Sequence, residues 1–355
     1  MKKNKKMLQF SHYQKESDSM ISRVIGFEKG FPLSNGNHFE TYEVMLPKLN
    51  RFDLVVKNLA VSINPVDTKL RQTGKGTPQP HVLGFDSVGI VTQVGSEVSA
   101  IEIGDRVVFA GTTKRFGSYS ESQVVDSRIV AKLPNGFSTD EAAAMPLTFL
   151  TAYELLFEKM KLVPEENQNN GAILIINGAG GVGSMATQLA KWAGLTVITT
   201  ASRKESKEWS EKMGADHVID HHKDLTKQLK KINYNSLPYI MILHSTDRYF
   251  DEMSDLLEPF GHLGSIVESS KDLNIAKLKN KSGSFDWEYM FAKTDYDYNI
   301  ASQGEILALM IHLLQEKKIK STLTKIIPGF SPDVFYQAHQ FVEENNMIGK
   351  LVVHY

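Results

Sequence analysis

Residues 20–140 follow the pattern of short β-strands separated by turns. Residues 52–63 (FDLVVKNLAVSI) are largely apolar, and β-branched residues recur in the stretches 86–95 and 105–111. Two further stretches, 117–125 and 128–134, continue the series, and glycines fall between the runs as they do in turns. This part of the chain is therefore predicted to form a compact β-rich domain.

Apolar runs alternate with helical patterns from residue 172 onward. Residues 172–176 (AILII) are apolar throughout, as expected of a strand buried on both faces. A helix is predicted over 184–193, with Gly194 at its end. Further strands are predicted at 195–200, 217–219, 239–243 and 263–267. Repeated strand–helix–strand units of this kind predict an α/β fold with a doubly wound parallel sheet.

The remaining segments set the predicted domain limits. The helical pattern of 138–160 contains Pro146, which predicts two helices or a break. A helix is predicted over 305–319 and strands over 322–328 and 349–355, and the last strand is expected to return to the β-rich domain. The prediction is an N-terminal tail of residues 1–19, a discontinuous β-rich domain of residues 20–145 and 296–355, and an α/β domain of residues 146–295.

The composition narrows the possible functions. The 355 residues carry a net charge of −1, so the chain as a whole does not attract nucleic acid or an acidic membrane. The chain has no cysteine, which excludes disulfides, thiolate catalysis and cysteine-ligated zinc, and which fits the cytoplasmic location that we expect. No run approaches the ~18 apolar residues of a membrane span, so no membrane partner is expected.

A glycine-rich turn lies between the strand 172–176 and the helix 184–193. Its sequence, GAGGVGS, lets the backbone approach a pyrophosphate, and the helix N-terminus supplies free N–H groups and a positive dipole end. The strand before it and the helix and strand after it complete the context that such a motif requires. The residues predicted to bind the pyrophosphate are Gly178, Ala179, Gly180, Gly181, Val182 and Gly183. The alternative is a tight turn without a ligand.

The end of the strand 195–200 distinguishes the two nicotinamide dinucleotides. An NAD site usually has an acid there for the ribose 2′-hydroxyl, whereas an NADP site has small polar and cationic residues for the 2′-phosphate. Ala201 stands near the acidic position, and Glu205 already lies inside the next helix. The predicted cofactor is therefore NADPH, with its 2′-phosphate bound by Ser202, Arg203 and Lys207. The alternative is a solvated, basic start of a helix.

Several segments spread over almost the whole chain form a combined pattern. They are 60–71 (AVSINPVDTKLR), 83–95 (LGFDSVGIVTQVG), 103–108 (IGDRVV), 117–122 (GSYSES), 150–156 (LTAYELL), 178–191 (GAGGVGSMATQLAK), 214–221 (GADHVIDH) and 348–353 (IGKLVV). Together they resemble the medium-chain dehydrogenase/reductase superfamily, and within it the zinc-independent quinone oxidoreductases and the "zinc-type alcohol dehydrogenase-like" branch. The resemblance implies a Rossmann-type nucleotide domain and a GroES-like β-rich domain. It also implies a homodimer that pairs edge strands, with 239–243 or 285–291 at the edge.

The resemblance also shows that metal ligands are missing. Zinc-dependent members have a cysteine on the segment that matches SINPVD, and this chain has Asn64 there. They have a histidine on the segment that matches LGFDSVG, and this chain has Phe85, which offers no lone pair. No metal is therefore predicted. The histidines around residue 221 are interpreted as part of a polar surface loop.

The resemblance implies roles for residues outside the glycine turn. Asn64, Asp67 and Thr151 are expected near the nicotinamide, although Asn64 has an alternative role as a turn residue and Thr151 as an ordinary helix residue. The candidate catalytic residues are Asn64, Asp67 and Tyr119, the last as a proton donor. The further residues expected at the cofactor are His221 near the adenine and its 2′-phosphate, His244 and Ser245 at the ligand edge of the sheet, and Lys350.

The missing metal bears on the substrate. Without a Lewis acid, the alkoxide of a simple alcohol–ketone reaction lacks strong stabilisation, whereas a quinone or an enone delocalises the added charge. The predicted function is hydride transfer from NADPH to a quinone or an α,β-unsaturated carbonyl, with 285–291 (FDWEYMF) as an aromatic cover or, alternatively, as core packing. The alternatives are an enoyl-thioester reductase and a non-catalytic relative that binds NADPH or RNA. Nucleic acid is an unlikely partner at a pI of about 6.8.

Overall fold

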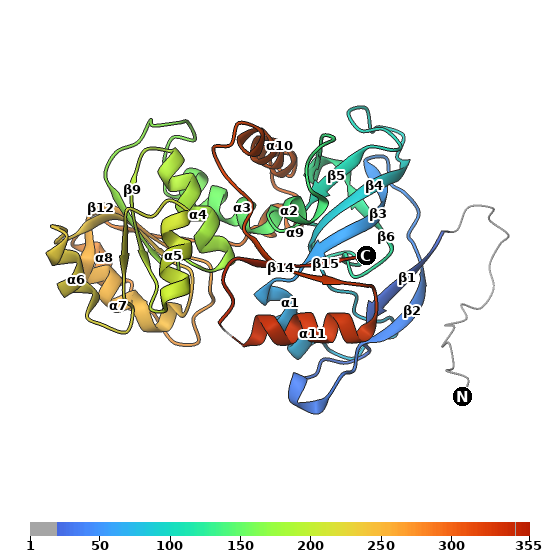
Figure 1. Ribbon diagram of the computed structural model, residues 1–355, viewed down its shortest axis with the longest axis horizontal. Helices are drawn as coiled ribbons and strands as arrows, with labels where there is room; N and C mark the ends of the chain where they lie inside the picture. Colours follow the sequence, from blue (N-terminus) through green and yellow to red (C-terminus); the bar gives the residue numbers. More distant parts are fainter. Residues whose placement is uncertain (1–19, 345) are drawn as a thin grey trace. The chain divides into compact units, whose positions relative to one another are not determined.

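The computed structural model describes residues 20–344 and 346–355 and divides the chain into two compact units (Figure 1). Among the described residues, the first comprises 20–147, Phe291–Ile311, 323–344 and 346–355, and the second comprises Thr148–Met290 and His312–Thr322. The predicted limits differ from this division at 146–147, 291–295 and 312–322. The predicted tail, residues 1–19, lies outside the described residues.

A side-chain clamp explains why residues 312–322 lie with the second unit. The amide of Gln188 donates to the Lys320 carbonyl at 3.1 Å and accepts from the Lys320 N–H at 2.8 Å. Lys318 also pairs with Glu166 at 2.6 Å. Hydrogen bonds between residues so far apart in the chain cannot be predicted from the local sequence. The predicted domain boundary therefore differs here.

A mixed sheet organises the described part of the first unit. Its strand order is β14-β15-β3-β4-β5-β7, with β6 paired to β3, and β1 and β2 form a separate antiparallel ribbon. The strands are β1 Ile21–Gly26, β2 Glu40–Met45, β3 Asp53–Ser62, β4 Asp86–Val94, β5 Arg106–Phe109, β6 Ser122–Asp126, β7 Val130–Lys132, β14 Leu323–Pro328 and β15 Lys350–His354. The C-terminal strand β15 pairs antiparallel with β3, which confirms that the end of the chain returns to this sheet.

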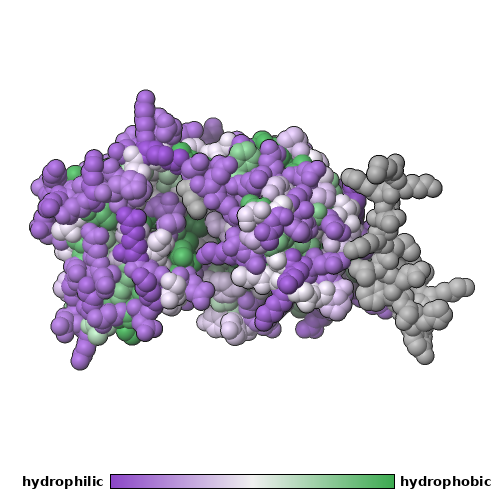
Figure 2. All heavy atoms as spheres, turned by 90° about the horizontal axis from the view of Figure 1, so that it is seen from below, coloured by the Kyte–Doolittle hydropathy of each residue, from purple (hydrophilic) through white to green (hydrophobic). Residues whose placement is uncertain are grey.

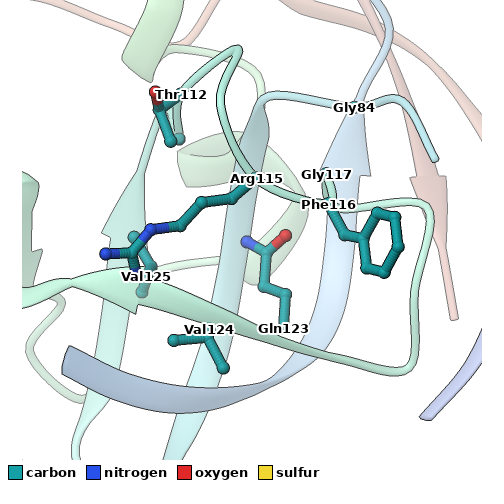
Figure 3. Close-up of a pocket in the computed structure, with 9 residues that line it drawn as sticks. Gly84, Thr112, Arg115, Phe116, Gly117, Gln123, Val124 and Val125 are labelled. Carbon is teal, nitrogen blue, oxygen red and sulfur yellow. The ribbon is translucent and has the colours of Figure 1, made fainter. Parts of the chain in front are cut away.

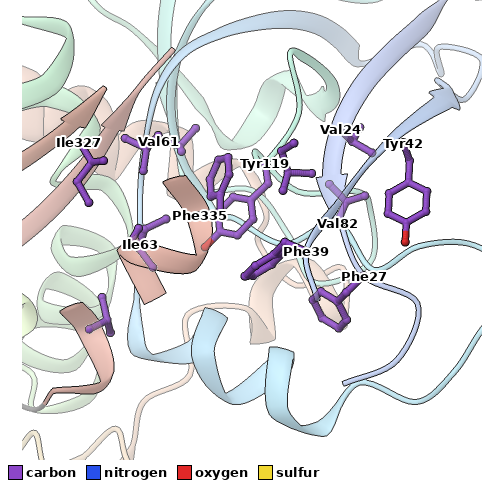
Figure 4. Close-up of a cluster of buried hydrophobic side chains, with 14 of the residues drawn as sticks. Val24, Phe27, Phe39, Tyr42, Val61, Ile63, Val82, Tyr119, Ile327 and Phe335 are labelled. Atoms are coloured by element: carbon purple, nitrogen blue, oxygen red, sulfur yellow. The ribbon is translucent and has the colours of Figure 1, made fainter. Parts of the chain in front are cut away.

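Helices of the first unit are mostly short. They are η1 Leu33–Asn35, α1 Pro65–Thr73, η2 Ser127–Ile129, α2 Thr139–Ala143, α9 Ala292–Asp295 and α11 Pro332–Glu343. Helix α10, Ala301–Gln315, begins in the first unit, and its residues from His312 onward belong to the second. Helix α11 packs its Phe335 against the Tyr119 ring, with 4.2 Å between the ring centroids. Figure 4 shows both rings in the buried apolar cluster with Val24, Phe27 and Phe39.

A parallel sheet forms the centre of the second unit. Its order is β10-β9-β8-β11-β12-β13, and every neighbouring pair is parallel. The strands are β8 Ala172–Ile176, β9 Thr196–Thr200, β10 His217–Ile219, β11 Leu237–Ile242, β12 Leu257–Ser265 and β13 Ser284–Trp287. In chain order this is 3-2-1-4-5-6, the doubly wound arrangement that was predicted. Because β11 lies inside the sheet, the expectation that 239–243 forms an edge is wrong, whereas β13 is an edge strand.

Helices connect the parallel strands of the second unit. They are α4 Gly181–Trp192, α5 Lys204–Lys212, α6 Leu225–Lys231, α7 Thr246–Leu256 and α8 Ala276–Lys279. The predicted break at Pro146 is confirmed, because α2 ends at Ala143 and α3 spans Pro146–Tyr153. The π-helix η3, Glu154–Lys159, continues α3.

The surface is mainly polar. Figure 2 shows that hydrophilic residues cover most of the face seen there, with small hydrophobic patches between them. Within the described residues no helix combines the length and the apolar character needed to cross a membrane.

Candidate active site

The glycine-rich turn follows β8 and opens α4. Asn177 leaves the strand with φ of +67°, and Gly180 caps α4 with an extended backbone. A Cβ added at Gly183 would lie 2.1 Å from the Asn177 carbonyl oxygen, and one added at Gly178 would lie 2.5 Å from the Thr199 Cβ. These two glycines are therefore required by the close packing of the turn, α4 and β9.

Packing does not require glycine at position 180 as it does at Gly178 and Gly183. A Cβ at Gly180 would approach within 2.8 Å only the end of the Asn177 side chain, which can turn away. Its N-cap position places it where the first N–H groups of the twelve-residue α4 begin, and the first turn of α4 has no acid. Helix dipole and free N–H groups favour an anion at such an end. The turn fits a pyrophosphate.

Cationic side chains collect at the carboxyl ends of β9 and β10. Arg203 caps α5 and is exposed, while Ser202 and Lys207 are half-buried. His221, just after β10, has its pKa lowered by burial and by the neighbouring His222 ring, whose centroid is 4.4 Å away. A neutral imidazole is therefore expected at His221 near pH 7.

Arg248 joins this group and was missed in the sequence. Its guanidinium donates to the His221 carbonyl at 3.2 Å, and its charge also lowers the pKa of the His221 ring. Arg248 lies in the first turn of α7, directly after β11, so the signal available was a cation at the ligand edge of a parallel strand.

His244 and Ser245 lie at the same edge, after β11. The Ser245 hydroxyl is 2.6 Å from His244 Nδ1, and Ser245 adopts φ of +52°. A left-handed serine is uncommon and marks a tightly constrained turn. Thr151 belongs to α3 and is buried. Their predicted roles at the cofactor stay predictions.

The first unit contains a second polar group at the predicted catalytic positions. Asn64 caps α1, its N–H donates to Asp67 Oδ2 at 2.8 Å, and Pro65 occupies the first helical position. The other Asp67 oxygen accepts from the Gly84 N–H at 3.0 Å. Asp67 is thus held by two backbone groups, which is the structural role that the NPVD segment has here.

Lys350 and Asp86 complete the group. The Lys350 ammonium donates to Asn64 Oδ1 and to the Ile63 carbonyl, the latter at 3.1 Å. It also lies 3.4 Å from Asp86 Oδ2. The Asn64 amide N–H donates to the same Asp86 oxygen at 2.8 Å. All four polar side chains are at most 2% exposed, so the first unit holds two carboxyls and one ammonium away from water.

Burial dominates the titration of these groups. It raises the pKa of Asp67 to about 7 and raises the pKa of Asp86, although hydrogen bonds and the Lys350 charge oppose both shifts. It lowers the pKa of Lys350, which the two carboxylates oppose. The group therefore takes up a proton near neutral pH.

Phe85, which the resemblance aligns with a histidine ligand, belongs to an aromatic pair. Phe85 is 4% exposed, and its ring lies 4.5 Å from that of Phe291, centroid to centroid. Among residues 20–344 and 346–355, no group of three or more histidine, aspartate or glutamate side chains is placed to hold a metal ion.

A small cavity lies beside Gly84. It is lined by Gly84, Gly111, Thr112, Arg115, Phe116, Gly117, Gln123, Val124 and Val125, as Figure 3 shows. Its volume of about 10 Å³ is that of a single water molecule. This cavity is too small for a quinone or an enone.

Tyr119 lies in the apolar core of the first unit, fully buried (Figure 4). Its hydroxyl is 2.9 Å from His339 Nε2, and the Arg71 guanidinium faces His339 Nδ1 at 3.4 Å. Burial raises the pKa of the Tyr119 phenol well above its usual value. Its role as proton donor stays a prediction, and its observed partner is a buried histidine.

Known proteins resemble this chain over nearly its full length. Residues 50–135 match the family described as "Alcohol dehydrogenase GroES-like domain", and residues 181–287 match "Zinc-binding dehydrogenase". The "Zinc-type alcohol dehydrogenase-like protein" of Staphylococcus aureus (strain Mu50) is 45% identical over 333 residues, which cover 93% of this chain and 99% of that protein.

Two further proteins are named for an activity or a ligand. The 2-methylene-furan-3-one reductase of Solanum lycopersicum is 31% identical over 88% of this chain and 74% of its own. The Escherichia coli quinone oxidoreductase, solved as a complex with NADPH, is 26% identical with a TM-score of 0.78, over 94% of this chain and all of its own.

Proposed function

The chain belongs to the medium-chain dehydrogenase/reductase superfamily of oxidoreductases, which use a nicotinamide cofactor, and from this premise we propose that it transfers hydride from NADPH to a quinone or an α,β-unsaturated carbonyl without a catalytic metal. The finer statements, namely the choice of NADPH, the acceptor class and the lack of a metal, rest on the residues described above.

The observation that carries the proposal is the replacement of the metal ligands. Asn64 Oδ1 accepts a hydrogen bond from Lys350, and Asn64 Nδ2 donates one to Asp86, so both ends of the side-chain amide are engaged. Phe85 packs on Phe291 and offers only apolar surface. An ammonium and an aromatic pair thus stand where a Lewis acid would be held, which favours an acceptor that delocalises the added charge itself.

The fit of the second unit supports a dinucleotide. The glycine turn would hold the pyrophosphate at the N-terminus of α4, and Ser202, Arg203 and Lys207 would hold the 2′-phosphate. The tomato reductase acts, by its name, on a conjugated ketone, and the Escherichia coli protein is a quinone oxidoreductase with NADPH bound. Both names are consistent with the acceptor class proposed for this chain.

The chemistry divides between cofactor and protein. Bound NADPH supplies the hydride. Hydride addition to the β-carbon of an enone leaves an enolate, and water supplies the proton at the α-carbon that gives the saturated carbonyl compound. In this proposal the glycine turn binds the pyrophosphate, and the N-terminus of α4 offsets its negative charge. Phe85 and Phe291 provide an apolar surface. Asn64, Asp67 and Tyr119 stay the catalytic candidates.

The test is oxidation of NADPH by the purified full chain against a panel of quinones, enones, enoyl thioesters and simple ketones, each with and without a chelator. The proposal expects turnover with quinones or enones that a chelator leaves unchanged. Turnover confined to simple ketones and abolished by chelation would overturn it. The predicted homodimer, with β13 at the edge, is tested separately by sedimentation.

A further inference from the structure

Two glutamates of the second unit form a buried pair that the proposed function does not yet use. Glu154 is the first residue of η3, and Glu288 directly follows the edge strand β13. They are 3% and 4% exposed, respectively. The Glu288 N–H donates to the Ser265 carbonyl at 2.9 Å, which fixes Glu288 at the carboxyl end of β12.

The pair holds one proton between its two carboxyl groups. Burial, the charge of Glu154 and the hydrogen bond between the two side chains together raise the pKa of Glu288 to about 9. Glu158 adds to this shift, and Lys159 opposes it. At neutral pH Glu288 is therefore the protonated partner and donates to the Glu154 carboxylate.

One carboxyl oxygen of this pair has no hydrogen-bond partner among the described residues. This oxygen is Glu288 Oε1, and it is buried. The contact with Glu154 is therefore made by the other oxygen, Oε2. A buried carboxyl oxygen that is left unpaired is costly, so an unpaired acceptor in a fully buried position points to a donor outside the chain.

The place of Glu288 in the sheet indicates which part of a bound dinucleotide could supply the donor. A doubly wound sheet is built from two mononucleotide-binding halves, and its ligand lies at the carboxyl ends of the strands. The glycine turn and the end of β9 serve the adenosine half, which leaves β11, β12 and β13 for the nicotinamide half. Glu288 follows the last of these strands.

Helix geometry places Glu154 in the same region. Glu154 comes three residues after Thr151, so the two side chains lie on one helix face. Segment η3 packs on β12, because a Cβ added at Gly264 would lie 2.7 Å from Leu155 Cδ1. Thr151 is the residue expected near the nicotinamide, so the pair and the predicted contact share one face.

We propose that Glu154 and Glu288 are positioning residues for the nicotinamide ring, and that Glu288 Oε1 accepts a hydrogen bond from the carboxamide N–H of the bound cofactor. This inference rests on the proposed use of a nicotinamide dinucleotide. Glu154 acts through Glu288, because its carboxylate holds the Glu288 carboxyl in one orientation. Neither side chain is assigned a proton transfer, so both are positioning residues.

The test compares two ligands that differ only at the carboxamide. NADP⁺ has the amide N–H, and its 3-acetylpyridine analogue has a methyl group there. Dissociation constants of both are measured by calorimetry, so the readout does not depend on turnover. A hydrogen bond of ordinary strength predicts that the wild-type protein prefers NADP⁺ by about two- to tenfold.

Three variants separate positioning from stability. Glu288→Gln keeps an acceptor oxygen and an N–H for Glu154, so it retains the preference. Glu288→Met removes the acceptor and brings the ratio of the two dissociation constants to about one, through weaker NADP⁺ binding alone. Glu158→Gln, the matched control on η3, removes a neighbouring charge and leaves the ratio unchanged.

The results that overturn the inference are distinct from those that overturn the function. A wild-type ratio of one, which needs no variant, refutes the contact while NADP⁺ binding survives. A wild-type ratio retained in Glu288→Met, or equal weakening of both ligands, also refutes it. A wild-type protein that binds neither ligand removes the cofactor proposal and this inference together.

Discussion

Replacing Lys350 by methionine should destabilise the first unit strongly. The Lys350 ammonium is 2% exposed and faces Asn64 Oδ1, the Ile63 carbonyl and Asp86 Oδ2. Methionine fills a similar volume but removes the Lys350 donor from Asn64 Oδ1 and the Ile63 carbonyl, and it leaves Asp86 without its counter-charge. Removing one partner of a buried ion pair typically costs about 3–5 kcal/mol.

The size of the effect can be measured as a melting temperature. For a unit of this size a loss of 1 kcal/mol lowers Tm by about 2–4 °C, so Lys350→Met should lower the melting temperature of the first unit by roughly 6–20 °C. Lys57 is the matched control, because it is an exposed lysine on β3 in the same unit. Lys57→Met should change Tm by much less.

A double variant distinguishes lost charge balance from lost packing. Adding Asp86→Asn to Lys350→Met removes the uncompensated carboxylate, and the Asn64 amide can then turn to meet the new amide. Most of the lost Tm should return. If Lys350→Met is no worse than Lys57→Met, or if Asp86→Asn makes it worse still, then the buried group is not held together by charge and our account of it is wrong.

Three further changes test other parts of the molecule. Arg203→Ala should weaken NADPH about ten- to a hundredfold by calorimetry and leave NADH nearly unchanged, because only NADPH has the 2′-phosphate; equal losses would contradict the assignment. Gly183→Ala should disturb the turn and abolish binding of both cofactors, since its Cβ would lie 2.1 Å from the Asn177 carbonyl oxygen; unchanged binding would show that the turn can adjust. Burial and Arg71 lower the pKa of His339, so stability is fully present above its unfolded pKa of about 6.5 and is lost as pH falls below it; in His339→Gln the slope of Tm against pH between 7.5 and 5.5 should flatten, and an unaltered slope would refute this.

Local patterns predicted the elements that are built from neighbouring residues. The all-apolar run 172–176 became β8, buried at every position, because a parallel strand covered on both faces has no polar side. The doubly wound parallel sheet followed from repeated strand–helix–strand units, whereas the order of its strands comes from the structure. The glycine turn was found because its close packing requires glycine at Gly178 and Gly183, at fixed places between a strand and a helix.

Pairings between distant segments left no such pattern. Glu154 and Glu288 lie in different segments of the chain, and nothing near either residue indicates a shared proton. Arg248 was missed for the same reason, since its partner is the carbonyl of His221, which belongs to another strand end. The stretch 117–125 was predicted as one strand, but β6 begins only at Ser122, because the backbone of residues 117–119 bonds to residues 82–84 and to Ile25 instead of to β3.

Each unit stabilises a buried carboxyl in its own way. In the first unit, the Lys350 ammonium lies 3.4 Å from Asp86 Oδ2 and donates to Asn64 Oδ1, so Asp86 has a counter-charge beside it. In the second unit, burial and the charge of Glu154 raise the pKa of Glu288, so a proton takes the place of the counter-charge. A buried acid needs one or the other, because an ionised carboxyl without a partner is costly away from water. The two groups should therefore respond differently to substitution: loss of Lys350 leaves a charge behind, whereas Glu288→Gln keeps a neutral donor for Glu154.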